Sequence, residues 1–203
     1  FGGFSVPENL GSVINTKHEE FSPRIHPDGK TLYFASKGHL GMGGFDIFFS
    51  RKDILGNWSE PINLGYPINT FADEYCPVLS ASGKVAYLSS DQSGGEGGMD
   101  IFQFDLAPEL RPEPVTYMKG KVFDKETKKA LFAAFQIIDL ESEETITSSF
   151  SDPITGDFMI AIPLGRNYAL NAEAENYLCY SDKFSVKGID QGKPYHKDVP
   201  MTS

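Results

Sequence analysis

The sequence is short of the residues on which several classes of protein depend. Two cysteines in 203 residues, Cys76 and Cys179, exclude a disulfide framework. No apolar run approaches the roughly 18 residues that a membrane-spanning helix needs. The 18 Lys and Arg residues are outnumbered by 28 Asp and Glu, and the net charge of −10 argues against binding to nucleic acid. By contrast, 16 Phe, 9 Tyr, 20 Gly and 13 Pro predict short aromatic strands separated by tight turns.

An internal repeat with a period of 54 residues organises the first half of the chain. The segment Pro-Glu-Asn-Leu-Gly at residues 7–11 returns as Pro-Ile-Asn-Leu-Gly at residues 61–65. Gly-Gly-Phe-Asp-Ile-Phe at residues 43–48 returns as Gly-Gly-Met-Asp-Ile-Phe at residues 97–102, and no gap is needed between these matches. A register kept over such a length indicates a repeated structural unit.

Each repeat unit predicts four short strands. The strands are rich in β-branched and aromatic residues, and turns such as Pro-Asp-Gly-Lys at residues 27–30 separate them. Four strands per unit at a period near 50 are typical of a β-propeller blade, with Tyr33 and Tyr87 at equivalent positions. The strands expected in the first unit are residues 21–26, 31–35, 45–49 and 58–62.

These repeats also carry a family resemblance. The pattern of residues 22–36, followed by Gly-Gly-Phe-Asp-Ile at residues 43–47, resembles the WD-like propeller repeats related to those of TolB. Residues 58–70, with Trp-Ser-x-Pro-x-Asn-Leu-Gly-x-x-Ile-Asn-Thr, look like the version found in OmpA-family outer-membrane proteins of Bacteroidetes. The second unit departs from the pattern at residues 81–83, where Ala-Ser-Gly replaces the Pro-Asp-Gly turn.

Residues 1–106 hold slightly less than two blades, because residues 4–10 supply only a last strand. Known propellers close with four or more blades, and an open pair leaves unpaired strand edges. We therefore expect an all-β chain in which a partial β-propeller of about two four-stranded blades belongs to a longer protein or to a ring of copies.

The second half of the chain predicts a different all-β domain. Residues 107–114 are rich in Pro and charge, as in an extended linker. In residues 115–203, apolar and polar residues alternate along several short segments, which predicts the strands of a small β-sandwich. The segments 120–124, 155–158 and 175–177 resemble those of a carboxypeptidase regulatory-like domain, which is a structural or adhesive module rather than a catalyst.

The order of the two domains extends the resemblance. A propeller followed by this sandwich is similar to the peptidoglycan-associated components of the type IX secretion machinery. In that family a helical-repeat region and an OmpA-like peptidoglycan-binding domain flank the pair. The resemblance implies a periplasmic, outer-membrane-associated protein with protein partners in the cell envelope, which reaches peptidoglycan only indirectly, through regions outside these residues.

Polar residues that recur with the repeat are the candidate partner-binding residues. They fall in the crossover between units and after the glycine-rich loop, which open onto one face of a propeller. Such a ring of groups suits a ligand or a peptide. Alternatively, the carboxylates fix the loops by accepting main-chain hydrogen bonds, and the strict period favours this structural interpretation. The candidates are Asn15, Thr16, Glu20, Asp46, Asn69, Thr70, Glu74 and Asp100.

Catalytic patterns are missing from the sequence. The 4 histidines form no zinc-enzyme spacing, and there is no Gly-x-Ser-x-Gly motif. Glu20 and Glu74 are the best pair of carboxylates, yet they occupy equivalent positions, whereas the acid and base of a glycosidase need different environments. The sequence thus predicts no enzyme, no cofactor and no metal site. It favours a scaffold or interaction module; the alternative is a propeller module that binds a glycan or small ligand.

Overall fold

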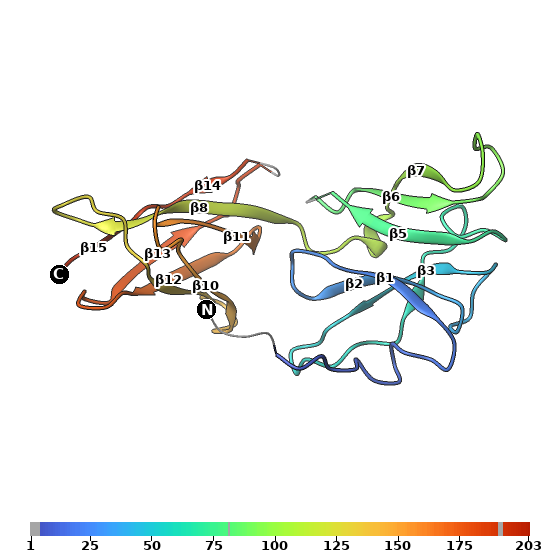
Figure 1. The fold of residues 1–203 in the computed structure, drawn as a ribbon, viewed down its shortest axis with the longest axis horizontal. Helices are drawn as coiled ribbons and strands as arrows, with labels where there is room; N and C mark the ends of the chain where they lie inside the picture. The colour runs from blue at the N-terminus through green and yellow to red at the C-terminus, as the bar shows by residue number, and fades with distance from the viewer. Residues whose placement is uncertain (1–4, 81, 191–192) are drawn as a thin grey trace. The chain divides into compact units, whose positions relative to one another are not determined.

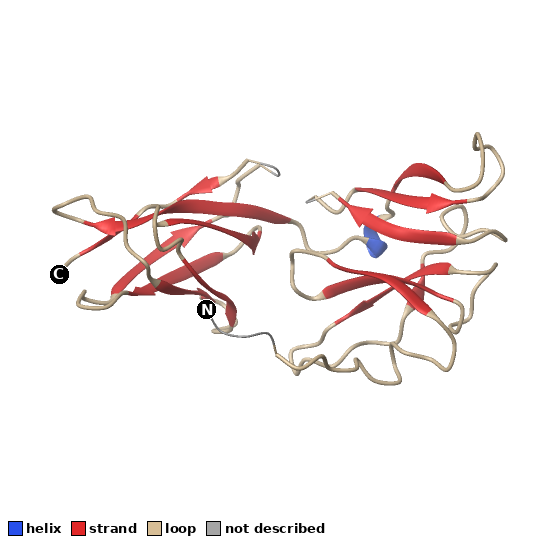
Figure 2. Cartoon of the chain, in the orientation of Figure 1, coloured by secondary structure: helices blue, strands red, loops and turns tan. Residues whose placement is uncertain are grey.

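The computed structural model describes residues 5–80, 82–190 and 193–203, and in these residues the chain is all β, as expected (Figure 2). The one helical segment among them is a 3₁₀ turn, η1 (Pro108–Leu110). No helix in the described ranges has the length and apolar character needed to cross a membrane. The chain divides into two compact units, Phe1–Pro112 (unit 1) and Glu113–Ser203 (unit 2) (Figure 1).

Unit 1 contains two antiparallel sheets in which strands that follow one another in the sequence are neighbours. The first sheet has the order β1-β2-β3-β4 and the second β5-β6-β7. The strands are β1 (Glu20–Ile25), β2 (Thr31–Ser36), β3 (Asp46–Arg51), β4 (Ile62–Asn63), β5 (Glu74–Leu79), β6 (Val85–Ser90) and β7 (Asp100–Asp105).

The sequence repeat is reproduced in the register of the two sheets. Tyr33 pairs with Arg24 in the first sheet, and Tyr87 pairs with Val78 in the second. The first strand of each sheet is irregular at the same place, where Ser22 and Cys76 have φ values of 52° and 53°. Equivalent residues therefore adopt equivalent conformations, even at a left-handed position that most side chains avoid.

The last strand of each sequence repeat is shorter than expected or is missing. β4 comprises Ile62–Asn63, preceded by an isolated bridge between Lys52 and Trp58. Residues 5–10 form no strand, because no strand of the described chain lies beside them to pair with their main-chain groups. Residue 4, which was also expected in that strand, lies outside the described residues.

The two sheets of unit 1 pack face to face around one apolar core. One face of the first sheet meets one face of the second, and the crossover between the sheets adds Leu64 and Ile68. Burial of this apolar surface is the main stabilising contribution. The fully buried strand residues of this core are Tyr33, Ala35, Ile47, Phe49, Ala86 and Leu88.

The other face of the first sheet is covered by a loop of the same unit. Leu32, Phe34 and Phe48 are buried there under Ile14, with Trp58 packed alongside. The segment before β1 therefore lies on the side of the first sheet that faces away from the second sheet.

The segment expected to be an extended linker begins instead as part of unit 1. The hydroxyl of Tyr33 donates a hydrogen bond to the carbonyl of Leu110 at 2.8 Å. The guanidinium of Arg51 donates to the carbonyls of Glu109 (3.2 Å) and Arg111 (2.7 Å). These contacts, with Leu110 against the core, hold residues 107–112 on the first sheet.

Unit 2 is sandwich-like, with two sheets on one core. The first has the order β10-β9-β12-β13, and the second β11-β8-β14, with β15 also paired to β8. The strands are β8 (Val115–Asp124), β9 (Ala134–Asp139), β10 (Thr145–Phe150), β11 (Asp157–Pro163), β12 (Asn167–Glu173), β13 (Tyr180–Ser185), β14 (Tyr195–His196) and β15 (Val199–Met201).

The core of unit 2 draws on both of its sheets. Met118 and Val122 of β8 pack with Ile137 of β9 and Leu170 of β12, and all four are fully buried. At one border, the guanidinium of Arg166 pairs with the carboxylates of Asp139, at 2.7 Å, and Glu113. Unit 2 thus has its own core and its own charged border.

The turn between β1 and β2 is fixed by one buried carboxylate. Asp28 accepts hydrogen bonds from the N–H groups of Lys30 and Thr31, both at 2.9 Å, and from the Thr31 hydroxyl at 2.8 Å. Burial raises the pKa of Asp28, but hydrogen bonds from His26, Lys30 and Thr31 outweigh burial and lower the pKa from 3.8 to about 2. The ionised side chain therefore stabilises the turn.

We predict that Asp28→Asn lowers the free energy of unfolding of unit 1 by about 2 kcal/mol at neutral pH. Because the pKa of Asp28 is lowered on folding, its contribution is present above about pH 4 and is lost as the pH falls through about 2. Urea unfolding, followed by the fluorescence of the single tryptophan, Trp58, measures this. Asp157→Asn, in unit 2, is the control; a deficit that stays constant down to pH 2 would contradict the assignment.

Candidate functional site

The candidate residues lie in two matching rows at one end of the sheets of unit 1. Within each row a glutamate, a serine and an aspartate are neighbours across three adjacent strands. The crossover residues Asn15, Thr16, Asn69 and Thr70 precede the two glutamates. The rows are Glu20, Ser36 and Asp46 in the first sheet and Glu74, Ser90 and Asp100 in the second.

Each glutamate holds the loop that precedes it. The carboxylate of Glu20 accepts hydrogen bonds from the N–H of Thr16 (3.2 Å), the hydroxyl of Thr16 (2.7 Å) and the hydroxyl of Ser36 (3.0 Å). Glu74 accepts the same two bonds from Thr70, at 3.2 and 2.7 Å. The oxygens that a ligand would need are thus engaged with the protein's own loop.

The two glutamates differ in their surroundings. Glu74 is fully buried at the junction of the two sheets, whereas Glu20 is partly exposed. Burial raises the pKa of Glu74, and the negative charge of Asp46 adds to the rise, while hydrogen bonds from Thr70 and Ser90 oppose it. Asp46 is itself buried, and its Oδ1 has no hydrogen-bond partner among the described residues.

Each aspartate of the rows closes a glycine-rich loop. Asp46 Oδ2 accepts hydrogen bonds from the N–H groups of Met42 (2.9 Å) and Gly43 (3.2 Å). Asp100 does the same at the equivalent residues of its own loop, at 2.9 and 3.2 Å. A Cβ on Gly41 would lie 2.0 Å from Asp46 Oδ2, so the loop closes only around glycine.

The two candidate asparagines are not in equivalent situations. Asn69 is fully buried, and its amide accepts from the N–H of Ile47 and donates to the carbonyl of Ile47, both at 2.8 Å. Asn15 is partly buried, and its side-chain amide nitrogen donates to Asn9 Oδ1 at 3.1 Å. Asn69 therefore ties the crossover to β3, while Asn15 holds only its own loop.

These bonds give the candidate residues a structural task. The oxygens of Glu20, Glu74, Asp46 and Asp100 order loops, as a buried or half-buried acceptor must. Among the described residues, no group of three or more His, Cys, Asp or Glu side chains is placed to hold a metal ion. A ligand-binding role for this ring of residues stays a prediction.

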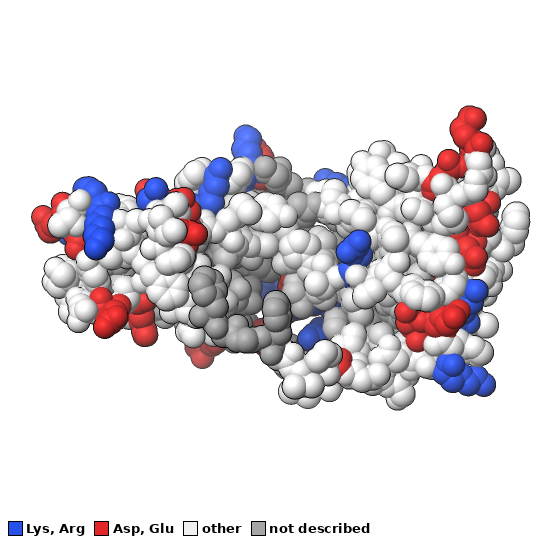
Figure 3. Space-filling view, in the orientation of Figure 1, with Lys and Arg blue, Asp and Glu red and all other residues white. Residues whose placement is uncertain are grey.

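Acidic side chains surround the same end of unit 1. Figure 3 shows Asp and Glu gathered where the loop between β6 and β7 lies. Burial raises the pKa of Tyr75, and the carboxylates of Asp73 and Asp91 raise it further. Asp73 and Asp91 are tied together, because the N–H of Asp73 donates to the Asp91 carboxylate at 3.0 Å. This end of the unit favours basic rather than acidic partners.

A cavity of about 380 Å³ lies where β1 and β5 meet. Arg24 and His26 line it from the first sheet, and Pro77 and Val78 from the second. The Nε2 atom of His26 is buried and has no hydrogen-bond partner among the residues that the structure describes. The cavity thus combines apolar walls with an arginine and a histidine.

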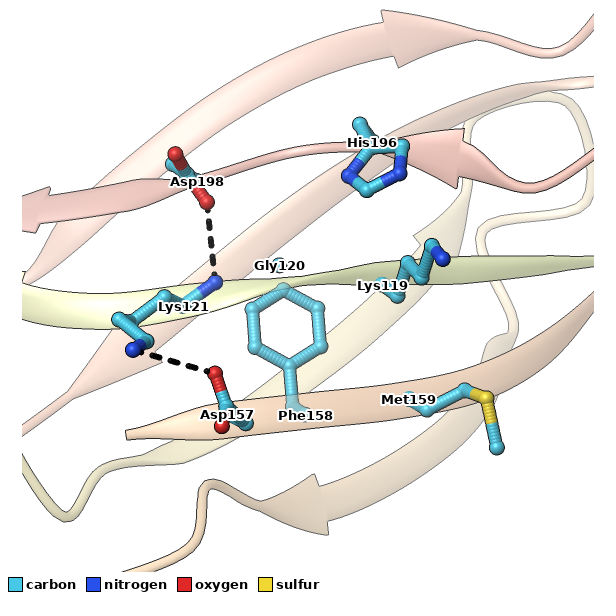
Figure 4. A pocket seen from close by; sticks show the side chains of 8 residues that line it. All are labelled: Lys119, Gly120, Lys121, Asp157, Phe158, Met159, His196 and Asp198. Carbon is cyan, nitrogen blue, oxygen red and sulfur yellow. Dashed lines mark hydrogen bonds and ion pairs between the residues drawn. The ribbon is translucent and has the colours of Figure 1, made fainter. Parts of the chain in front are cut away.

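A shallow hollow of about 570 Å³ lies on unit 2, beside β8 and β11 (Figure 4). It holds one ion pair and one main-chain hydrogen bond to a carboxylate. Lys121 Nζ lies 3.5 Å from Asp157, and the N–H of Lys121 donates to Asp198 at 3.0 Å. Gly120 forms its floor, because a Cβ there would lie 1.9 Å from the carbonyl of Lys197.

Sequence reasoning missed an exposed apolar surface on the second sheet. Tyr33 and Ile47 are both 0 % exposed, but their repeat equivalents, Tyr87 and Ile101, are 41 % and 79 % exposed. Met99 is also exposed, at 49 %. We call the surface that carries Tyr87, Met99 and Ile101 the open face. The sequence signal for this face is that the second repeat keeps apolar residues at these positions, although residues 107–203 do not continue the repeat.

Comparisons with known proteins assign no family. No protein-family model and no curated protein matches the chain. A group B streptococcus pilus 2b backbone protein is 12% identical at a TM-score of 0.40, over 91% of this chain and 97% of that one. The structure described as S.CueP is 11% identical at 0.34, over 62% and 74%. The Bacillus anthracis TIE protein is 10% identical at 0.38, over 85% of this chain but 42% of that one.

We predict that Glu74→Gln lowers the free energy of unfolding of unit 1 by about 1 kcal/mol at neutral pH, because an amide nitrogen cannot accept the bond from Thr70. The pKa of Glu74 is raised on folding, so the wild type gains stability as the pH falls from neutral toward 4.5. The deficit of the variant should therefore grow as the pH falls.

Urea unfolding between pH 7 and pH 4.5 measures this deficit. Glu20→Gln, which loses the same threonine contacts at a partly exposed position, is the matched control. A Glu74→Gln deficit that shrinks on acidification would show that the buried carboxylate is stabilised rather than destabilised by its surroundings.

Proposed function

We propose that this chain is a non-enzymatic scaffold that binds other proteins in an outer-membrane-associated complex of the periplasm, such as the type IX secretion machinery. The observation that carries the proposal is the open face. Tyr33 and Ile47 are buried in the core between the two sheets of unit 1. Their repeat equivalents, Tyr87 and Ile101, are exposed to solvent. Large apolar side chains that stand exposed together on one face of a sheet are typical of an interaction site.

The open face can be compared with the equivalent face of the first sheet, which is buried in the core of unit 1. Ile47 and Tyr33 are buried by a second sheet, so the same residue types at Ile101 and Tyr87 present a surface already suited to burial by protein. Tyrosine and methionine, which the open face carries at Tyr87 and Met99, are enriched at protein interfaces. A scaffold that works through this face needs no catalytic group.

The finer architecture belongs to the same proposal. We interpret the two sheets of unit 1 as two blades of a β-propeller and unit 2 as a carboxypeptidase regulatory-like sandwich, in a chain of the OmpA family of Bacteroidetes. The matching registers of the two sheets support the blades. The separate core of unit 2 supports a module that is structural or adhesive.

The polar rows support a scaffold over an enzyme. The carboxylate oxygens of Glu20 and Glu74 each accept hydrogen bonds from a threonine and a serine of the same sequence repeat. A catalytic carboxylate needs an accessible oxygen within reach of substrate. Their hydrogen bonds instead make loops rigid at the end of the unit that would meet a partner.

Affinity capture from cell-envelope extracts tests the proposal. The full chain is the bait, with Ile101→Asp on the open face as the test variant and Met159→Asp, an exposed apolar residue of unit 2, as the matched control. We expect the wild type and the control to retain the same envelope proteins, and Ile101→Asp to retain at least tenfold less. Equal retention by all three baits would remove the open face from the proposal. Glycosidase, peptidase or esterase turnover lost on substituting Glu20 or Glu74 would replace the scaffold by an enzyme.

The cavity between β1 and β5 favours the alternative, a module for a glycan or small ligand. It offers the guanidinium of Arg24 beside the apolar Pro77 and Val78, a combination common in small-molecule sites. A glycan array followed by calorimetry tests it. A ligand bound by the wild type and lost in Arg24→Ala, with no envelope protein captured, would favour this function over the scaffold.

A further inference from the structure

We infer that unit 2 carries a docking site for an arginine side chain of a partner protein. The site is a pocket of about 550 Å³ at the start of β9 and the end of β12. We call it the aromatic pocket; the residues that line it include Phe132, Ala134, Glu173, Glu175 and Tyr177. It is separate from the open face of unit 1, so the inference goes beyond the proposed function and does not depend on it.

The alternation of side chains along β9 and β12 produces the aromatic pocket. Phe135 and Ala172 belong to the core of unit 2, so their neighbours Ala134 and Glu173 lie on the opposite face of the sheet. Ala134 pairs with Glu173 on one side and with Phe150 on the other. The smallest side chain therefore stands in the middle of a row across three strands, and the space above it is left free.

Aromatic rings form part of the wall of the pocket. The ring of Phe132 stacks on that of Phe150, with the centroids 5.5 Å apart and the planes at 8°. These two side chains are in residues that are 54 % and 62 % exposed, so their stacking is not part of the core. Tyr177 adds a further ring. An exposed aromatic face attracts a cation through the negative charge density of its π system.

The two carboxylates of the aromatic pocket have no partner of their own. Neither Glu173 nor Glu175 forms a hydrogen bond or ion pair with a residue that the structure describes, and no described Lys or Arg lines the pocket. The border of unit 2 differs in this respect, because Asp139 is paired there with Arg166 at 2.7 Å. Two negative charges beside aromatic rings thus stand without a compensating cation.

The turn that carries Glu175 and Tyr177 is held in place by the protein itself. The N–H of Tyr177 donates to the carbonyl of Ala174 at 3.2 Å, and the N–H of Leu178 donates to the carbonyl of Thr202 at 2.8 Å. The hydroxyl of Tyr177 donates to Asp124 Oδ2 at 2.9 Å, which fixes the ring. A site that is ordered before its partner arrives loses less entropy on binding.

An arginine side chain matches both the apolar and the acidic part of the pocket. Its methylene stem can lie on Ala134 and Phe132, as the stems of long cationic side chains do on apolar surface. Its planar guanidinium stacks on aromatic rings and has five N–H donors, enough for the carboxylates of both Glu173 and Glu175. An acidic segment would be repelled, and an apolar segment would desolvate the two carboxylates without compensation.

The arginine belongs to a protein segment rather than to a free small molecule, because apolar surface continues beyond the pocket. Phe150 packs against Phe132 without lining the pocket, and Leu178, directly after Tyr177, is 66 % exposed. The residues on either side of a bound arginine would contact these side chains. The net charge of −10 also favours the approach of a basic segment.

An NMR titration of the full chain with the blocked pentapeptide Leu-Ser-Arg-Ser-Leu tests the inference. We expect the amide signals of residues 132–134 and 173–177 to shift, with a Kd of about 1 mM, because a single exposed cation binds weakly. The same peptide with citrulline, the uncharged analogue of arginine, should bind at least about fivefold more weakly. N-acetylarginine amide, which has no flanking residues, should also bind more weakly than the peptide.

Two variants separate the charge of the pocket from its shape. Glu173→Gln combined with Glu175→Gln removes both carboxylates, and Ala134→Leu fills the pocket but keeps them. All three positions are exposed, so both variants should fold. Each should weaken binding of the arginine peptide at least about fivefold.

Each variant has a matched control. Glu60→Gln combined with Glu143→Gln removes the same charge at exposed positions outside the pocket. Gln136→Leu adds the same side chain as Ala134→Leu two residues further along β9, on the same face of the sheet. Both controls should bind the peptide as the wild type does.

Undiminished binding by Ala134→Leu, equal binding of the citrulline peptide, or shifts confined to the acidic end of unit 1 would overturn the inference. Equal affinity for N-acetylarginine amide would overturn the assignment to a protein segment. Ile101→Asp should bind the peptide like the wild type, because the open face lies in unit 1. Envelope capture that depends on Ile101, without peptide binding in the aromatic pocket, would leave the proposed function standing and remove this site alone.

Discussion

The bonds between Asn69 and Ile47 are the interaction on which unit 1 depends. A single side-chain amide satisfies both main-chain groups of a buried strand residue and so replaces a rung of a sheet ladder. It does this at the point where the chain leaves the first sheet for the second. Together with the bond from the N–H of Leu64 to the carbonyl of Ile47, this tie fixes the path of the crossover that brings Leu64 and Ile68 into the core between the sheets. The face-to-face packing follows from this anchored crossover.

The buried carboxylates extend the same arrangement to the loops. Glu74 begins β5 directly beside the first sheet, and its N–H donates to the carbonyl of Phe45 at 2.7 Å. Its side chain then holds Thr70, four residues earlier, and Ser90 across the strand. A charge in that place costs stability, but each of its acceptors is matched by a local donor. Hydrogen bonds to these carboxylates thereby make the loop end of unit 1 rigid.

Local features of this fold could be predicted from the sequence, and features that depend on distant contacts could not. The turn at Asp28 and the equivalent registers of Tyr33 and Tyr87 follow from residue pattern and period alone. Ile47 and Ile101 carry the same sequence signal, yet one is buried and the other exposed, because burial depends on whether a further sheet is present. Leu110 looked like linker by composition, but the core of unit 1 holds it. The candidate residues share one repeat pattern in the sequence, but their hydrogen bonds to their own loops depend on the folded path of those loops and do not follow from the pattern.

The way in which the chain leaves unit 1 decides how mechanical tension would pass through it. Residues 107–112 are bonded to Tyr33 and Arg51, in strands β2 and β3. The same segment is also tied to the second sheet, because the N–H of Leu106, directly after β7, donates to the carbonyl of Lys84 at 2.8 Å. A pull applied to the chain beyond Pro112 is therefore shared between both sheets of unit 1, so the two sheets would resist it together.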